Sequence, residues 1–142
     1  AQVEQVKDQN GLQAIKVTFN DGILFGFNST QLNAASRDAL SKFSGTIITE
    51  PDMAITIYGN TDNVGTHAVN EKVSLERAQA VQNFLLGHGV SASQIIKVQG
   101  LAYDNPIASN DTEAGRAQNR RVEIFLTANE KMIKAAEQQA SK

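Results

Sequence analysis

The sequence contains no cysteine, no tryptophan and only two histidines among its 142 residues. The absence of cysteine excludes a disulfide framework and a thiolate metal site. The two histidines, His67 and His88, stand too far apart for a paired metal-ligand spacing, and we interpret both as surface residues. The sequence therefore predicts neither a bound metal nor a cofactor.

A basic patch and a long apolar run are also missing. The formal net charge is −2, whereas a nucleic-acid partner usually needs a basic stripe. No apolar run approaches the roughly 18 residues of a membrane helix. The chain starts at 1-AQVEQVKDQNG-11 without a signal peptide, as expected of a piece of a longer protein. We expect no nucleic-acid partner, and a membrane link only through an N-terminal element outside this chain.

What the sequence does contain is an alternation of strand-like and helix-like segments. Alternating apolar residues and turn signals predict strands at residues 12–19, 23–27, 53–58, 95–100 and 120–127. Apolar residues at helical spacing predict a helix from about residue 30 to 49, with Asn28 or Ser29 as its N-cap. A second helix is predicted from Ser74 to Leu86, with residues 66–73 as a short turn or an extension of it. Residues 101–115 are typical of a long polar loop.

This order of elements predicts a single α+β domain. A mixed sheet of about four strands should carry two long helices packed on one face. The domain itself should span residues 12–127, after a polar N-terminal segment at 1–11 and before a helix-prone tail at 128–142. The length suits one domain that buries a real core.

Arg77 departs from the pattern of the second helix. Val81 and Phe84 follow it by four and seven residues, so all three share one helical face, which should be the buried one. Arg77 would then point toward the core in the first turn, where the helix dipole disfavours a cation by roughly 0.3–1 kcal/mol. An arginine in that position needs an anion.

Asp62 is a carboxylate in the turn 58-YGNTDNVG-65, just beyond the predicted strand 53–58. In open α/β sheets, the crevice outside such strand ends is the usual ligand site. Asp62 and Arg77 together suit a zwitterion, with an ammonium group on the carboxylate and a carboxylate in the guanidinium fork. A direct salt bridge between Asp62 and Arg77 is the alternative.

More cations lie at the start of the last strand. Arg120 shares the inward phase of Val122 and Ile124, whereas Arg121 should point to the other face of the sheet. Arg116 precedes them in the loop. Taken alone, the three arginines also fit a solvated surface run.

Three separated motifs resemble the OmpA-like peptidoglycan-binding domain. The run 59-GNTDNVGTHAVNEKVSLERAQAVQNFL-85 is similar to the family signature of Gly-His-Thr-Asp, Tyr-Asn, Leu-Ser and Arg-Ala. The segment 115-GRAQNRRVEIFL-126 resembles the motif Gly-Arg-x-x-Asn-Arg-Arg-Val-Glu, and 23-ILFGFNSTQL-32 resembles Phe-x-Phe-(Asp/Asn)-Ser. The resemblance covers roughly residues 14 to 127. Three motifs in the right order make it specific.

The resemblance implies a non-catalytic module that holds the bacterial cell wall. The implied ligand is the peptidoglycan stem peptide, chiefly its meso-diaminopimelate residue, and the implied place is the periplasm. There the module would tether an outer-membrane protein or lipoprotein to the wall. The family pattern assigns contacts with the ligand to residues that match its motifs, which are Asp62, Arg77, Thr61, Asn70, Asn28 and Arg120.

Some positions depart from the family pattern. Asn60 replaces the usual His, Val69 the Tyr and Val73 the Leu, and 100-GLAYDNP-106 differs from the usual Gly-x-Gly-Glu-x-x-Pro. None of these changes removes a residue that would contact the ligand. Asn60 and Val69 lie where they would alter the edge of the pocket.

Two rival functions remain open from the residues. A wall-peptide hydrolase would need a nucleophile or a metal, and Asp62 with His67 is the only acid–base pair in the turn region. A binder of phosphate or another small anion would use the Gly65 loop and a helix start at Ser74, but the loop lacks the Gly-Lys-Ser/Thr of a P-loop.

Overall fold

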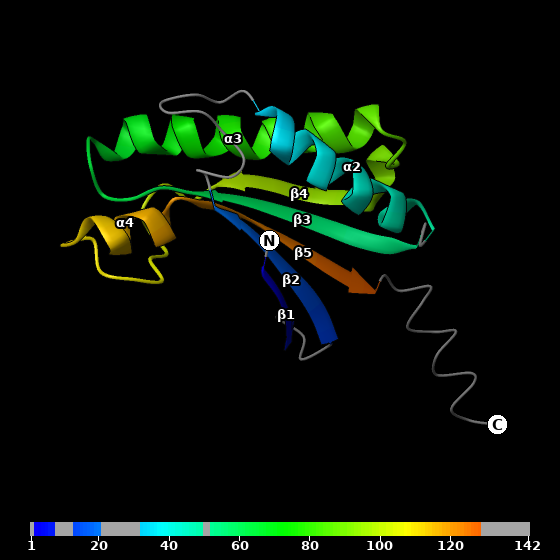
Figure 1. Cartoon of the computed structure of the whole chain (residues 1–142), viewed down its shortest axis with the longest axis horizontal. Helices are drawn as coiled ribbons and strands as arrows, with labels where there is room; N and C mark the ends of the chain where they lie inside the picture. The colour runs from blue at the N-terminus through cyan, green and yellow to red at the C-terminus, as the bar shows by residue number, and fades with distance from the viewer. Residues whose placement is uncertain (1, 8–12, 21–31, 50–51, 129–142) are drawn as a thin grey trace.

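Five strands form one mixed sheet in the computed structural model, which describes residues 2–7, 13–20, 32–49 and 52–128 (Figure 1). In sequence order, the strands are β1 (Gln2–Lys7), β2 (Gln13–Asn20), β3 (Met53–Asn60), β4 (Ile95–Gly100) and β5 (Arg121–Ala128). Across the sheet the order is β1-β2-β5-β3-β4, with β3 and β4 parallel and all other neighbours antiparallel. The predicted mixed sheet is confirmed, and β1 is a strand that the sequence pattern did not predict. The strand predicted at 23–27 and the tail from residue 129 lie outside the described residues.

Two long helices, α2 (Ala34–Ile48) and α3 (His67–Gly87), cover the same face of the sheet (Figure 1), which confirms the predicted layers. The short helix η1 (Ala92–Gln94) leads into β4. A further helix, α4 (Glu113–Asn119), forms where the sequence predicted loop up to residue 115. None of the helices within these ranges is long and apolar enough to cross a membrane.

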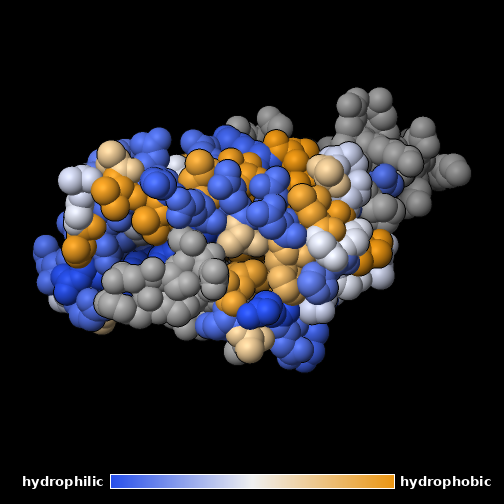
Figure 2. All heavy atoms as spheres, turned by 90° about the horizontal axis from the view of Figure 1, so that it is seen from above, coloured by the Kyte–Doolittle hydropathy of each residue, from blue (hydrophilic) through white to orange (hydrophobic). Residues whose placement is uncertain are grey.

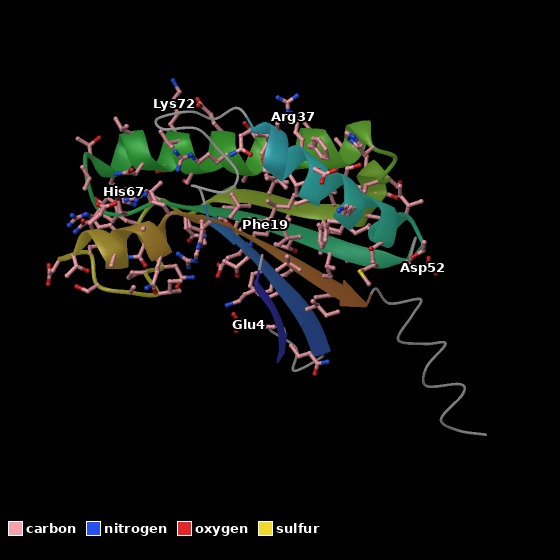
Figure 3. All side chains as sticks on the ribbon, viewed as in Figure 1. Glu4, Phe19, Arg37, Asp52, His67 and Lys72 are labelled. Carbon is pink, nitrogen blue, oxygen red and sulfur yellow. The ribbon has the colours of Figure 1, made fainter. Side chains whose placement is uncertain are left out.

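The core lies between the sheet and the two long helices. It is built from Leu40 and Ile47 on α2, and from Ala78, Val81 and Leu85 on α3, all at most 1% exposed. The sheet contributes alternate side chains of its strands, including those of Val17, Phe19, Ile55, Ile57, Val122, Ile124 and Leu126. Phe19 lies beneath the helices (Figure 3), with its ring edge-on to that of Phe43. Because strand side chains alternate between faces, this set leaves the intervening residues of β5 on the opposite face.

One long helix begins later than predicted, and the other begins at the earlier of the two starts that the sequence left open. The N-cap of α2 is Asn33, whose Oδ1 accepts a hydrogen bond from Ser36 N at 2.9 Å, so the predicted start near residue 30 is wrong. The N-cap of α3 is Thr66, whose hydroxyl accepts from Val69 N at 3.2 Å. Residues 67–73 therefore extend the helix, and Ser74 lies inside it. Since a side-chain oxygen satisfies an otherwise unpaired amide at each start, local capping sets these boundaries.

Two glycines allow α3 to lie directly on the ends of β3 and β4. A Cβ atom added to Gly59 would stand 1.9 Å from the carbonyl oxygen of Ser74, and one added to Gly100 would stand 2.4 Å from Leu75 N. No side chain fits at either position. The close approach fixes the buried face of α3 against the carboxyl end of β3, where the turn that holds Asp62 begins.

Candidate functional site

The candidate site lies at the carboxyl ends of the parallel strands β3 and β4, where α4 also packs (Figure 1). The segments that follow the two strands stay paired, since Leu101 N donates to Gly59 O at 2.9 Å and Thr61 N donates to Ala102 O at 2.8 Å. Ala102 N in turn donates to the hydroxyl of Ser74 on α3. These bonds hold the turn after β3, the loop after β4 and α3 together as one frame.

Asp62 is held from two sides. Asp62 is only 8% exposed. Its Oδ1 accepts a hydrogen bond from Val64 N at 3.0 Å, and its Oδ2 accepts one from Arg120 Nη1 at 2.8 Å. One oxygen therefore shapes the turn, while the other already binds a cation. The cation in contact is Arg120, which is 58 residues away in sequence.

Thr61 and Asn70 brace this turn. The hydroxyl of Thr61 donates to the carbonyl oxygen of Asp62 at 2.8 Å. The amide nitrogen of Asn70 donates to Val64 O at 2.8 Å and to Thr66 O at 3.0 Å, and the residue is 7% exposed. Both residues lie beside Asp62, as the family motif implies, and their bonds position the carboxylate. Asn28 lies outside the described residues.

Arg120 joins Asp62 to a second carboxylate, that of Glu113. Its Nη2 donates to Glu113 Oε1 at 2.8 Å, while Nε of Arg116 donates to Glu113 Oε2 at 3.3 Å. The hydrogen bond from Arg120, then that from Arg116, lowers the pKa of Glu113 below its ordinary value of 4.5. Sequence reasoning missed Glu113. The available signal was Thr112 directly before it, which caps α4 by accepting from Gly115 N.

Asn119 organises the loop that precedes α4. It is fully buried, and its Oδ1 accepts from Ile107 N at 2.8 Å and from Ala108 N at 3.0 Å. Its Nδ2 donates to Ala108 O and to Asn110 Oδ1, both at 2.9 Å. Sequence reasoning placed Asn119 inside the second family motif but gave it no role. The residue before Arg120 thus anchors the backbone from which that arginine reaches Asp62.

Arg121 is buried rather than solvated. As the alternation of side chains predicted, it lies on the face opposite Val122. Its guanidinium donates to Asn119 O at 3.0 Å and to Asn105 O at 2.9 Å, and its Nε lies 3.2 Å from Glu123 Oε2. The interpretation of these arginines as a solvated surface run is wrong for Arg121, because backbone carbonyls at the end of α4 and in the loop before it accept its hydrogen bonds.

Arg77 lies on the buried face of α3, as predicted. It is 8% exposed, and Val81 on the same face is 0% exposed. Its expected place in the first turn is wrong, because α3 starts at His67, about three turns earlier. The unfavourable dipole term that we expected at Arg77 therefore does not apply, since that effect fades beyond the first turn.

His67 packs against the loop after β4. Its Nε2 lies 2.8 Å from Asp104 Oδ1, and its ring meets that of Tyr103 edge-on. The side chain is 44% exposed, and it lies at the end of the molecule that carries α4 (Figure 3). Tyr103 thus packs the loop after β4 against the start of α3. The carboxylates beside His67 in the structure are those of Asp104 and, 3.8 Å from its Nδ1, Glu71, whereas the acid–base hypothesis paired it with Asp62.

The surface at this end combines apolar and charged groups. Val64, Val69 and Ile107 are 64%, 58% and 54% exposed. From above, hydrophobic residues stand beside hydrophilic ones at the end that carries α4 (Figure 2). Of the two residues expected at the edge of a pocket, Val69 is thus on the surface, whereas Asn60 is buried, with 2% exposed.

Two alternative chemistries find little support in the geometry. No group of three or more His, Cys, Asp or Glu residues in the described part of the chain could hold a metal ion. The phosphate site expected at a helix start at Ser74 is wrong. Ser74 is fully buried within α3, and its hydroxyl donates to Glu71 O at 3.0 Å.

Comparisons with known proteins place these motifs in a family. The sequence model of the OmpA family matches residues 24–120. Outer membrane protein A of Bordetella avium is 37% identical over 128 residues, which cover 90% of this chain and 66% of that protein. Peptidoglycan-binding protein ArfA of Mycobacterium tuberculosis (strain ATCC 25618 / H37Rv) is 40% identical over 80% of this chain and 34% of its own length. This chain thus spans from about a third to just under two thirds of these relatives.

A solved structure supports the same assignment. The peptidoglycan-associated lipoprotein of Burkholderia pseudomallei is 30% identical, with a TM-score of 0.68. The match covers 74% of this chain and 88% of that one.

Proposed function

Because this chain belongs to the OmpA family, we propose that it binds peptidoglycan without catalysis and anchors a larger protein to the cell wall. The relatives support this proposal: one is named a peptidoglycan-binding protein, and one is a peptidoglycan-associated lipoprotein. The proposed location is the periplasm, beside the outer membrane, where the relatives named above as outer membrane protein and lipoprotein belong. The link to that membrane would come from a part of the protein outside this chain.

The observation that carries the proposal is the Asp62 carboxylate at the carboxyl end of β3. It is nearly buried, held by the Val64 amide, and already bound to one cation, Arg120. A carboxylate fixed in this way is prepared to accept a charge-assisted hydrogen bond from an ammonium group. The turn that holds it lies within the family motif.

The proposed ligand is the stem peptide of peptidoglycan, recognised through meso-diaminopimelate. Its side chain ends in an ammonium group and a carboxylate on the same carbon atom, so it is a local zwitterion. We assign the ammonium to Asp62 and the carboxylates to Arg77 and Arg120, since a guanidinium fork fits a carboxylate. Thr61 and Asn70 would act mainly by holding the turn, and Asn28 remains a proposed contact.

The test is co-sedimentation of the chain with purified peptidoglycan that contains meso-diaminopimelate. Asp62→Ala and Arg77→Gln should abolish sedimentation, while two surface controls on α2, Asp38→Ala and Arg37→Gln, should bind like the unaltered chain. Asp38 is a suitable control because its side chain is 76% exposed. Equal sedimentation of all four variants would contradict the proposed site. The supernatant should contain no soluble muropeptides, and their release would instead indicate a hydrolase.

A further inference from the structure

The position that Asp62 offers to a ligand cation is held by a cation of the protein itself. Arg120 Nη1 lies 2.8 Å from Asp62 Oδ2, and the Asp62 side chain is only 12% exposed. An incoming ammonium would bring a second positive charge to a carboxylate that is largely covered. Both oxygens of Asp62 already accept a hydrogen bond, Oδ1 from Val64 N and Oδ2 from Arg120 Nη1, so an ammonium that reaches this covered carboxylate competes with the guanidinium for Oδ2.

Arg120 has a second carboxylate partner besides Asp62. Its guanidinium bridges the carboxylates of Asp62 and Glu113, so the loss of the contact with Asp62 still leaves it one ion pair. Its other nitrogen, Nη2, lies 2.8 Å from Glu113 Oε1. This contact from α4 gives the guanidinium an anion near the site when Asp62 releases it.

We propose that Arg120 and Glu113 select the charge of the ligand by an exchange of ion pairs, an inference that rests on the proposed function. The ligand ammonium takes the place of Arg120 on Asp62. Arg120 remains on Glu113 and turns its freed Nη1 to the carboxylate beside that ammonium. Two ion pairs thus replace one, and no charge is left unpaired.

This exchange explains why the site would reject a simple amine. A ligand with an ammonium and no adjacent carboxylate still has to displace Arg120, but it gives the guanidinium no anion in return. The arginine therefore acts as an internal competitor against such ligands and as a binding group for zwitterions. Glu113 is a positioning residue, because it acts on the ligand only through Arg120.

The experiment compares two stem peptides by calorimetric titration. One carries meso-diaminopimelate with its side-chain carboxylate free, and the other carries the same residue with that carboxylate amidated. The unaltered chain should bind the free acid about tenfold more tightly, which corresponds to one charge-assisted hydrogen bond. Arg120→Gln should reduce that preference to about threefold or less, and should bind the amidated peptide more tightly than the unaltered chain does.

Two further variants distinguish the exchange of ion pairs from a purely structural role of Arg120. Arg116→Gln removes another arginine that contacts Glu113, and it should keep the preference of the unaltered chain. Glu113→Gln should weaken binding of the amidated peptide, because the displaced Arg120 then loses the anion that receives it. Amide spectra of each variant establish that the fold is intact.

The outcomes are distinct. If Arg120→Gln weakens both peptides by the same factor, Arg120 only braces the site and the exchange is refuted while wall binding stands. Equal affinity of the unaltered chain for the two peptides also refutes the exchange. If the unaltered chain binds neither peptide, the proposed function fails, and the exchange fails with it.

Discussion

Replacing Asn119 with alanine tests how the loop before α4 is held in place beside Arg120. The side chain accepts hydrogen bonds from Ile107 N and Ala108 N and donates to Ala108 O and Asn110 Oδ1. The substitution removes all four bonds from a fully buried position. It leaves two backbone amides without an acceptor.

The expected cost follows from those bonds. Each contributes about 1 kcal/mol net, so complete loss would cost about 4 kcal/mol. Ile107 is 54% exposed, so water can reach part of the freed loop and replace some bonds. We therefore expect Asn119→Ala to lower the free energy of unfolding by about 2–3 kcal/mol, a large fraction of the 5–15 kcal/mol that is typical of domains.

The assay is urea unfolding followed by circular dichroism, with hydrogen exchange of the Ile107 and Ala108 amides. The matched control is Asn105→Ala in the same loop, since Asn105 accepts from Arg121 through its backbone carbonyl. The control should change stability by less than about 0.5 kcal/mol. If Asn119→Ala were as stable as the control and both amides remained protected, the role assigned to Asn119 would be wrong.

Three further predictions concern the packing and the charges. Gly59→Ala should destabilise the fold by about 3 kcal/mol or more in thermal unfolding, since its Cβ would meet the backbone of α3. Gly45→Ala has open space around its Cβ and should stabilise α2 by about 0.5–1 kcal/mol in the same assay. Glu123→Gln should cost about 3–5 kcal/mol in urea unfolding, because it leaves the buried Arg121 without its carboxylate, and a loss below 1 kcal/mol would contradict this account. A carbon-13 NMR titration should show the pKa of Glu113 below 4.5. Its ion pairs should therefore persist above pH 4.5 and be lost as the pH falls through the lowered pKa of the folded state. In Arg120→Gln the pKa of Glu113 should rise toward 4.5.

Much of the fold was predictable because apolar side chains recur at regular spacing. The alternation in β3 and β5 and the helical spacing in α2 identified those elements, and the order of strands and helices identified the layers. Two elements lacked such a signal. The seven-residue helix α4 is too short for helical periodicity to reveal, and β1 is defined by its antiparallel pairing with β2. Neither feature is visible in a local window of sequence.

The helix boundaries show the same limit. Residues 67–73 are mostly polar and exposed, so the apolar spacing of α3 becomes visible only further along the helix. The actual start depends on one hydrogen bond from Val69 N to the Thr66 hydroxyl. That earlier start changed the electrostatic surroundings predicted for Arg77.

The site was predicted in part. The phase of α3 correctly placed Arg77 on a buried face, and Asp62 lies just beyond the end of β3, as predicted. The partner is Arg120 rather than the Arg77 of the alternative salt bridge, and 58 residues separate Arg120 from Asp62. Contacts over that distance in sequence depend on how β3 and β5 pair, which no local pattern states. The buried state of Arg121 was missed for a related reason, since its acceptors are backbone carbonyls of Asn105 and Asn119, which no local pattern places beside it.

The most direct test of the account is calorimetric titration of the chain with a stem peptide that contains meso-diaminopimelate. The same peptide with lysine at that position and an Asp62→Ala variant serve as comparisons. The account predicts saturable binding of the diaminopimelate peptide, weaker binding of the lysine peptide, and no binding by the variant. A folded chain that gave no heat with either peptide, or an Asp62→Ala variant that bound as tightly as the unaltered chain, would contradict it.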